Sequence, residues 1–190
     1  MGVPMDTRAQ FAELTTPHLA AAYNLAFWIT RSRADAEDVV QDAYLRAWRG
    51  FGGFRGGPML PWLLAIVRNA AYRWMSTHRH AGNVVSLDTL FLGDDGTPDP
   101  AMQIAADAPT AEAAMIAASE NAHVMRALAS LPPVLREILV LREIEGMSYH
   151  EIALTTGSPA GTVMSRLSRA RLALRRALSG TTEKDSLHAV

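Results

Sequence analysis

Cysteine is absent from the 190-residue chain, and Lys184 is its only lysine. Without cysteine, neither disulfides nor thiolate zinc sites can form, which agrees with a reducing cytoplasm. The first residues lack the basic-then-apolar layout of a signal peptide. The longest apolar run, PMLPWLLAIV, is broken by Pro61 and is too short to span a bilayer. We therefore expect a soluble cytoplasmic protein with no direct membrane insertion.

The sequence also lacks the signatures of a catalytic or cofactor site. It has no glycine-rich phosphate loop, no nucleophile elbow and no paired carboxylates in a recognisable cleft. Its histidines are scattered without the spacing of metal ligands. They are His18, His78, His80, His123, His150 and His188. We expect no enzyme activity, no cofactor and no metal.

Charge is nearly balanced overall, at a formal −1, but it is distributed unevenly along the chain. No Lys or Arg occurs between Arg79 and Arg126. The acids in that interval are Asp88, Asp94, Asp95, Asp99, Asp107, Glu112 and Glu120. By contrast, the stretch SPAGTVMSRLSRARLALRR carries five arginines and no acid. Arginine suits bidentate contact with phosphates and guanine edges, although a GC-rich genome is an alternative source of this bias.

Hydrophobic spacing and helix-end signals predict three helices in the N-terminal part of the chain. The first covers residues 8–31, the second begins after the N-cap Ser32 and ends near Gly50, and the third covers about 61–78. A glycine-rich loop, FGGFRGGP, separates the last two. The residues predicted to face the core are Val39, Val40, Ala43 and Ala47 in the second helix and Leu63, Val67, Ala70 and Trp74 in the third.

The C-terminal part shows four further helical segments. Residues 110–131 and 134–145 form two of them, separated by a Pro-Pro stop. Ser148 and Glu151 form a capping box that opens a short helix over 148–156. Gly157 ends that helix, and we expect Ser158 to cap the last one, with Pro159 at its first position. The tail after Gly180 is expected to be loose.

These elements predict an all-α fold of two small helical domains. One domain is expected over residues 8–80 and the other over 112–179, with an acidic flexible linker at 81–111. A short helix, a glycine turn and a longer basic helix follow the plan of a helix-turn-helix. We expect the second domain to be a helix-turn-helix unit.

The helical wheel of the last helix separates an apolar side from a polar one. Its apolar side consists of Val163, Leu167, Ala170, Leu174 and Leu178. Its opposite side consists of Thr162, Ser165, Arg169, Leu172 and Arg176, flanked by Arg166 and Ser168. Small polar residues allow close approach to a DNA groove, and arginines reach bases and phosphates. This pattern favours DNA binding over a basic face that only meets solvent.

Three segments occur in an order typical of one protein family. DAEDVVQDAYLRAWRGF, WLLAIVRNAAYRWM and GMSYHEIALTTGSPAGTVMSRLSRARLALRR together closely resemble the extracytoplasmic-function (ECF) sigma factors of bacterial RNA polymerase. The resemblance covers about residues 8–80 and 112–178. It implies a region 2 helical bundle, a region 4 helix-turn-helix, and a function in directing core polymerase to promoters and initiating transcription.

The resemblance also implies partners and three groups of site residues. Binding to core polymerase, at its clamp coiled coil and flap, is expected to involve Asp38, Gln41, Asp42, Leu45 and Arg46. Binding to the opened −10 element is expected to involve Arg55, Met59, Trp62, Asn69, Tyr72 and Arg73. Binding to the −35 element is expected to involve Thr162, Ser165, Arg166, Ser168, Arg169 and Arg171. An anti-sigma factor is a further expected partner.

Two positions leave alternatives open. Trp62, beside Pro61, is as typical of a core anchor as of a base contact. Met164 stands where family members often have a basic residue, so the −35 preference differs or one contact is missing. Two other function classes also remain: a stand-alone helix-turn-helix regulator, and a helical adaptor that sequesters another protein.

Overall fold

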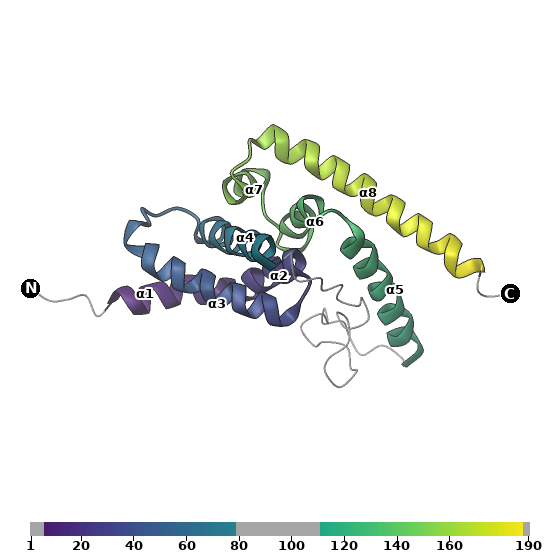
Figure 1. Cartoon of the computed structure of the whole chain (residues 1–190), viewed down its shortest axis with the longest axis horizontal. Coiled ribbons are helices and arrows are strands. Elements are labelled where there is room, and N and C mark those ends of the chain that lie inside the picture. The colour runs from purple at the N-terminus through teal and green to yellow at the C-terminus, as the bar shows by residue number, and fades with distance from the viewer. Residues whose placement is uncertain (1–5, 79–110, 188–190) are drawn as a thin grey trace, which may run out of the picture.

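A computed structural model describes the backbone of residues 6–78 and 111–187, and the side chains of residues 7–78 and 121–179. Within these ranges every regular element is helical, as predicted (Figure 1). Most of the predicted linker over 81–111 lies outside the described residues. The helices form an N-terminal unit, α1 to α4, and a C-terminal unit, α5 to α8.

The N-terminal unit contains four α-helices and two short 3-10 turns. These elements are α1 (Asp6–Thr15), η1 (Thr16–His18), α2 (Leu19–Thr30), α3 (Arg33–Gly50), η2 (Phe51–Gly53) and α4 (Met59–His78). The prediction of one continuous helix over 8–31 is wrong, because Pro17 lies in η1 and has no N–H to continue the hydrogen-bond ladder. The Ser32 cap is confirmed, since its Oγ accepts a 3.3 Å hydrogen bond from the Asp35 N–H.

Helices α2, α3 and α4 pack on one another through their apolar faces. Leu25 of α2, Ala43 of α3 and Leu63 of α4 are fully enclosed. The predicted core residues of α3 and α4 are buried, apart from Trp74, which is half-buried and stacks on His78 with ring centroids 4.1 Å apart. The packing leaves the opposite face of α3 exposed along its length.

The C-terminal unit contains α5 (Ala111–Ser130), α6 (Pro133–Leu139), a π-helical turn η5 (Val140–Ile144), α7 (Tyr149–Thr156) and α8 (Ala160–Leu187). Helix α8 lies along α5 and covers α6 and α7 (Figure 1). Because α6 gives way to the π-helical turn at Val140, the helix predicted over 134–145 is α-helical only in its first half. The prediction of a loose tail after Gly180 is wrong, because α8 continues to Leu187.

The start of α8 also differs from the prediction. The carbonyl of Pro159 accepts the first α-helical bond, 3.1 Å from the Val163 N–H, so Pro159 occupies the N-cap position. The Oγ of Ser158 instead accepts a 2.9 Å hydrogen bond from Arg166 Nη1. Ser158 therefore ties the turn to the second turn of α8 rather than capping the helix.

The two units pack against each other in this structure. Helix α4 lies against α7, and α2 lies against α6 and η5. The apolar contacts are continuous, so that Phe27 and Leu64 of the first unit belong to the same buried cluster as Ile138 and Ile152 of the second. The face of α4 that meets α7 is therefore covered by the C-terminal unit.

Candidate nucleic-acid interface

The turn between α7 and α8 is fixed at both of its ends. At the start of α7, the Ser148 N–H donates to Glu151 Oε2 at 2.8 Å, and the Glu151 N–H donates to Ser148 Oγ at 3.2 Å. The Ser148 hydroxyl also donates to Glu151 Oε2 at 2.7 Å, and this bond together with the Ser148 N–H bond holds the pKa of the Glu151 carboxyl below its usual value. At the end of α7, Gly157 adopts a left-handed conformation (φ 62°), and its N–H bonds to the Ala153 carbonyl. The predicted short helix, capping box and glycine turn are confirmed.

Helix α8 presents a polar face on the side opposite its buried residues. Val163, Leu167 and Ala170 are each at most 1% exposed, which confirms the first three positions of the apolar side of the wheel, whereas Leu174 and Leu178 are half-buried. The exposed residues of the predicted −35 set are Ser165, Ser168, Arg169 and Arg171, whereas Thr162 and Arg166 are half-buried. Met164 lies 51% exposed among them. This part of α8 therefore presents hydroxyls, guanidinium groups and one thioether at the surface.

Arg171 has a partner that the sequence did not indicate. Its Nη2 and Nε lie 2.7 Å and 3.1 Å from Glu143 Oε1 in η5. This carboxylate raises the pKa of Arg171. The pair is open to solvent, so it links η5 to α8 without removing Arg171 from the surface.

Helix α3 carries the predicted polymerase-binding residues on its outer face. Asp38, Gln41, Leu45 and Arg46 are exposed, and Leu45 is exposed to 56%. Asp42 is half-buried, and its Oδ2 accepts a 2.7 Å hydrogen bond from Arg46 Nε one turn later. An exposed leucine within a ring of charged and amide groups is chemically suited to a polar protein–protein interface.

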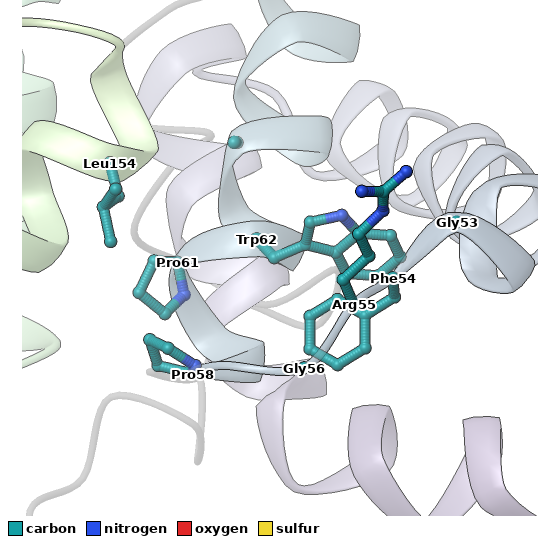
Figure 2. Close-up of a pocket in the computed structure, with 9 residues that line it drawn as sticks. Gly53, Phe54, Arg55, Gly56, Pro58, Pro61, Trp62 and Leu154 are labelled. Carbon is teal, nitrogen blue, oxygen red and sulfur yellow. The ribbon is translucent and has the colours of Figure 1, made fainter.

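A cavity of about 320 Å³ lies at the start of α4 (Figure 2). Arg55 lies at its rim, and Trp62 is half-buried with its ring tilted over Phe54 at 5.0 Å. Leu154 of α7 projects toward the same cavity from the other unit. Met59 is the first residue of α4, two positions before the predicted start of that helix, and is only 8% exposed.

Further along α4, the predicted −10 residues divide between solvent and the interface of the two units. Asn69 and Arg73 are exposed. Tyr72 is half-buried, and its hydroxyl donates a 2.5 Å hydrogen bond to Glu137 Oε2. Burial and the Glu137 carboxylate raise the pKa of Tyr72. Glu137 also pairs with Arg68, and no sequence signal pointed to this acid.

The described part of the chain offers no metal-binding group of three or more His, Asp or Glu side chains. Among the described helices, none has the length and apolarity needed to cross a membrane.

Two family models match the chain and correspond to the two helical units. "Sigma-70 region 2" matches residues 14–81, and "Sigma-70, region 4" matches residues 122–174. The first match begins at the end of α1 and covers α2, α3 and α4, and the second runs from within α5 into α8. The all-α fold with a region 2 bundle and a region 4 helix-turn-helix is thereby confirmed.

Individual relatives point to the same family. The chain is 32% identical to the ECF RNA polymerase sigma factor SigE of Mycolicibacterium smegmatis, over 86% of this chain and 59% of that protein. It is 33% identical to the ECF RNA polymerase sigma-E factor of Escherichia coli K12, over 74% of this chain and 72% of that protein. The chain thus spans less than two thirds of the M. smegmatis relative.

A solved structure of similar fold is the sigma factor RpoE of Bartonella quintana in complex with the anti-sigma factor NepR. It superposes with a TM-score of 0.67 and 26% identity, over 90% of this chain and 97% of that chain. With the two family models and the relatives, this likeness leads to one identification: the chain belongs to the sigma-70 family, among its ECF sigma factors.

Proposed function

We propose that this chain directs core RNA polymerase to specific promoters and initiates transcription there, without catalysing a reaction itself. The observation that carries the proposal is the outer face of α8. Ser165, Ser168 and Arg169 are exposed on one face of α8. The helix before it, α7, begins with a capping box and ends at Gly157. Small hydroxyls beside a guanidinium group are the side chains that read base edges in a major groove.

The same proposal assigns the DNA contacts. The −35 element is bound by Ser165, Ser168 and Arg169, with Thr162 at the start of the helix and with Arg166 and Arg171 on phosphates. The −10 strand is bound by Asn69 and Arg73, with Arg55 at the rim of the cavity and Trp62 in its wall. Met59 is buried and supports this surface from behind, whereas Tyr72 is half-buried against the C-terminal unit and reaches the strand only where that unit moves away.

Core polymerase is bound by the outer face of α3. Asp38, Gln41 and Leu45 point away from the bundle, and Asp42 and Arg46 hold each other one turn apart. We assign this face to the clamp coiled coil and the C-terminal unit to the flap. The functional domains are residues 8–80 and 112–179, with 81–111 as a linker between them. Because the partner is the transcription machinery, the chain acts in the cytoplasm.

An anti-sigma factor is proposed as a further partner. The similar RpoE of B. quintana is bound to the anti-sigma factor NepR. An exposed polar α3 face and an exposed basic α8 face would both have to be covered to keep the chain from polymerase and promoter.

In vitro transcription tests the proposal. Bacterial core polymerase is incubated with genomic template, with and without this chain, and the transcripts are mapped. Initiation at defined sites only in the presence of the chain supports the proposal, and none at any site contradicts it. Arg169→Ala is expected to reduce these transcripts. Arg8→Ala, an equal loss of charge at an exposed position of α1, is expected to leave them unchanged.

A further inference from the structure

A charged side chain is buried where the two units meet. Glu137 of α6 is 2% exposed, although carboxylates are almost never enclosed without partners. Its Oε1 accepts from Arg68 Nε, and its Oε2 accepts from the Tyr72 hydroxyl at 2.5 Å. Both donors belong to α4, more than 60 positions earlier in the chain. Each oxygen of the carboxylate therefore has one donor, and both donors come from the other unit.

Arg68 and Tyr72 form a donor pair that is already arranged for an anion. They lie one helical turn apart, and the Arg68 guanidinium lies 4.8 Å from the centre of the Tyr72 ring. Asn69 and Arg73, next to them on α4, are exposed. A guanidinium group and a hydroxyl at this separation suit two oxygens of one carboxylate or of one phosphate.

The contact between the units has polar and apolar parts beside this pair. Asn24 Nδ2 donates to Glu145 Oε1 at 3.0 Å, and Thr155 Oγ1 donates to the Pro61 carbonyl at 3.4 Å. Leu154, half exposed at 51%, lines the same cavity as Trp62 (Figure 2). The C-terminal unit thus covers one edge of α4 from Pro61 to Tyr72.

We propose that Arg68 and Tyr72 form a phosphate-binding site for a single DNA strand, and that the Glu137 carboxylate occupies this site as an internal competitor in the free chain. The proposal rests on the assignment of α4 to the −10 strand. A backbone phosphate and the carboxylate have the same charge and compete for the same donors. The strand therefore binds at this site only when α6 and α7 move away from α4.

The site explains the burial of Glu137. Both hydrogen-bond donors of Glu137 come from α4, so separation of the units would leave its carboxylate without the partners it has in the closed chain. Burial of the carboxylate is balanced only while Arg68 and Tyr72 face it. The contacts of Glu137 with Arg68 and Tyr72 consequently hold the two units together in the free chain, whereas binding of a DNA strand to Arg68 and Tyr72 favours their separation.

A binding titration tests the proposal. The probe is a short, fluorescently labelled single-stranded DNA of mixed sequence, added to the free full-length chain. Glu137→Gln keeps the shape of the side chain but removes its charge, and we expect about tenfold tighter strand binding. The control Glu13→Gln removes the same charge from an exposed position of α1, and a change of less than about twofold is expected.

A double variant identifies the site. Adding Arg68→Gln to Glu137→Gln should abolish the gain in affinity, because the freed donor is then missing. Leu154→Gln weakens the apolar contact between the units at a half-exposed position, so it should give a smaller gain in strand affinity. This variant replaces Glu137→Gln in the titration if Glu137→Gln does not fold. Small-angle scattering should show a larger radius of gyration for both single variants than for the parent chain. Excess inorganic phosphate should compete only weakly with the strand, which separates a strand site from a free-phosphate site.

Three results would overturn the proposal: equal strand affinity for Glu137→Gln and the parent chain, a gain that persists without Arg68, or inorganic phosphate that binds as well as the strand. These results are distinguishable from failure of the proposed function. If only the phosphate-site proposal fails, the parent chain still supports promoter-specific transcription. If the parent chain supports no such transcription, the promoter role is refuted, whichever result the oligonucleotide titration gives.

Discussion

Gly157 sets the angle at which α8 leaves α7, and replacing it with alanine should destabilise the C-terminal unit. Its φ is +62°, a conformation that costs a residue with a Cβ about 1–2 kcal/mol. An added Cβ would meet no atom within 4 Å, so no steric term adds to this cost. Alanine also reduces the conformational entropy of the unfolded chain, which offsets part of this cost. We therefore expect Gly157→Ala to lower the free energy of unfolding by a net of about 1 kcal/mol.

Gly161 is the matched control. It lies in the first turn of α8 without a positive φ, and an added Cβ there also meets nothing within 4 Å. Gly161→Ala should therefore raise the free energy of unfolding by a few tenths to about 1 kcal/mol. Urea unfolding followed by circular dichroism measures both variants. Equal changes of the same sign would refute the argument that backbone conformation at Gly157 sets this turn.

Three further changes separate the surfaces from the fold. Leu45→Glu, at a 56% exposed position, should leave the melting temperature unchanged but weaken binding to core polymerase, and equal affinity in a fluorescence titration would contradict the α3 assignment. Arg169→Ala should cost about 1–3 kcal/mol in holoenzyme binding to a −35 duplex and relax its sequence preference, as a mobility-shift assay would show. Ser148→Ala should cost about 1 kcal/mol of stability. This cost in stability should shrink as the pH falls below about 4.3, because the Glu151 carboxyl with its lowered pKa contributes stability only while it is ionised. A cost that does not change with pH would exclude a contribution from the ionised Glu151 carboxyl.

Local signals predicted much of the fold. Ser32, the Ser148 capping box and Gly157 act through hydrogen bonds to near neighbours, so the sequence alone indicates them. The break at Pro17 does not show in the periodicity, because apolar residues continue at helical spacing on both sides of it. Ser158 looked like an N-cap, but the nearby Arg166 guanidinium takes its hydroxyl in the folded chain. Periodicity therefore predicted the existence of helices better than their ends.

The exposed faces of the helices were predictable because they follow from local helical spacing. The side-chain contacts between different helices were not predictable in this way. Burial of Val163 and Leu167 follows from helical spacing, and so does exposure of Ser165 on the opposite side. The partners of Glu137 depend on how α6 meets α4, which no local pattern encodes. Arg136, beside it, is 2% exposed, and burial together with the nearby Arg31 charge lowers its pKa to about 10. A sequence pattern would place both charges on the surface.

Mapping of transcription start sites on whole genomic DNA tests the central claim most directly. Core polymerase is supplied with this chain or with Arg169→Ala, and the 5′ ends of the transcripts are sequenced. Our account predicts that starts dependent on the chain share two upstream elements, near −10 and −35, and that Arg169→Ala relaxes only the −35 element. Starts without a shared pair of elements, or a −35 element unaffected by Arg169→Ala, would contradict it.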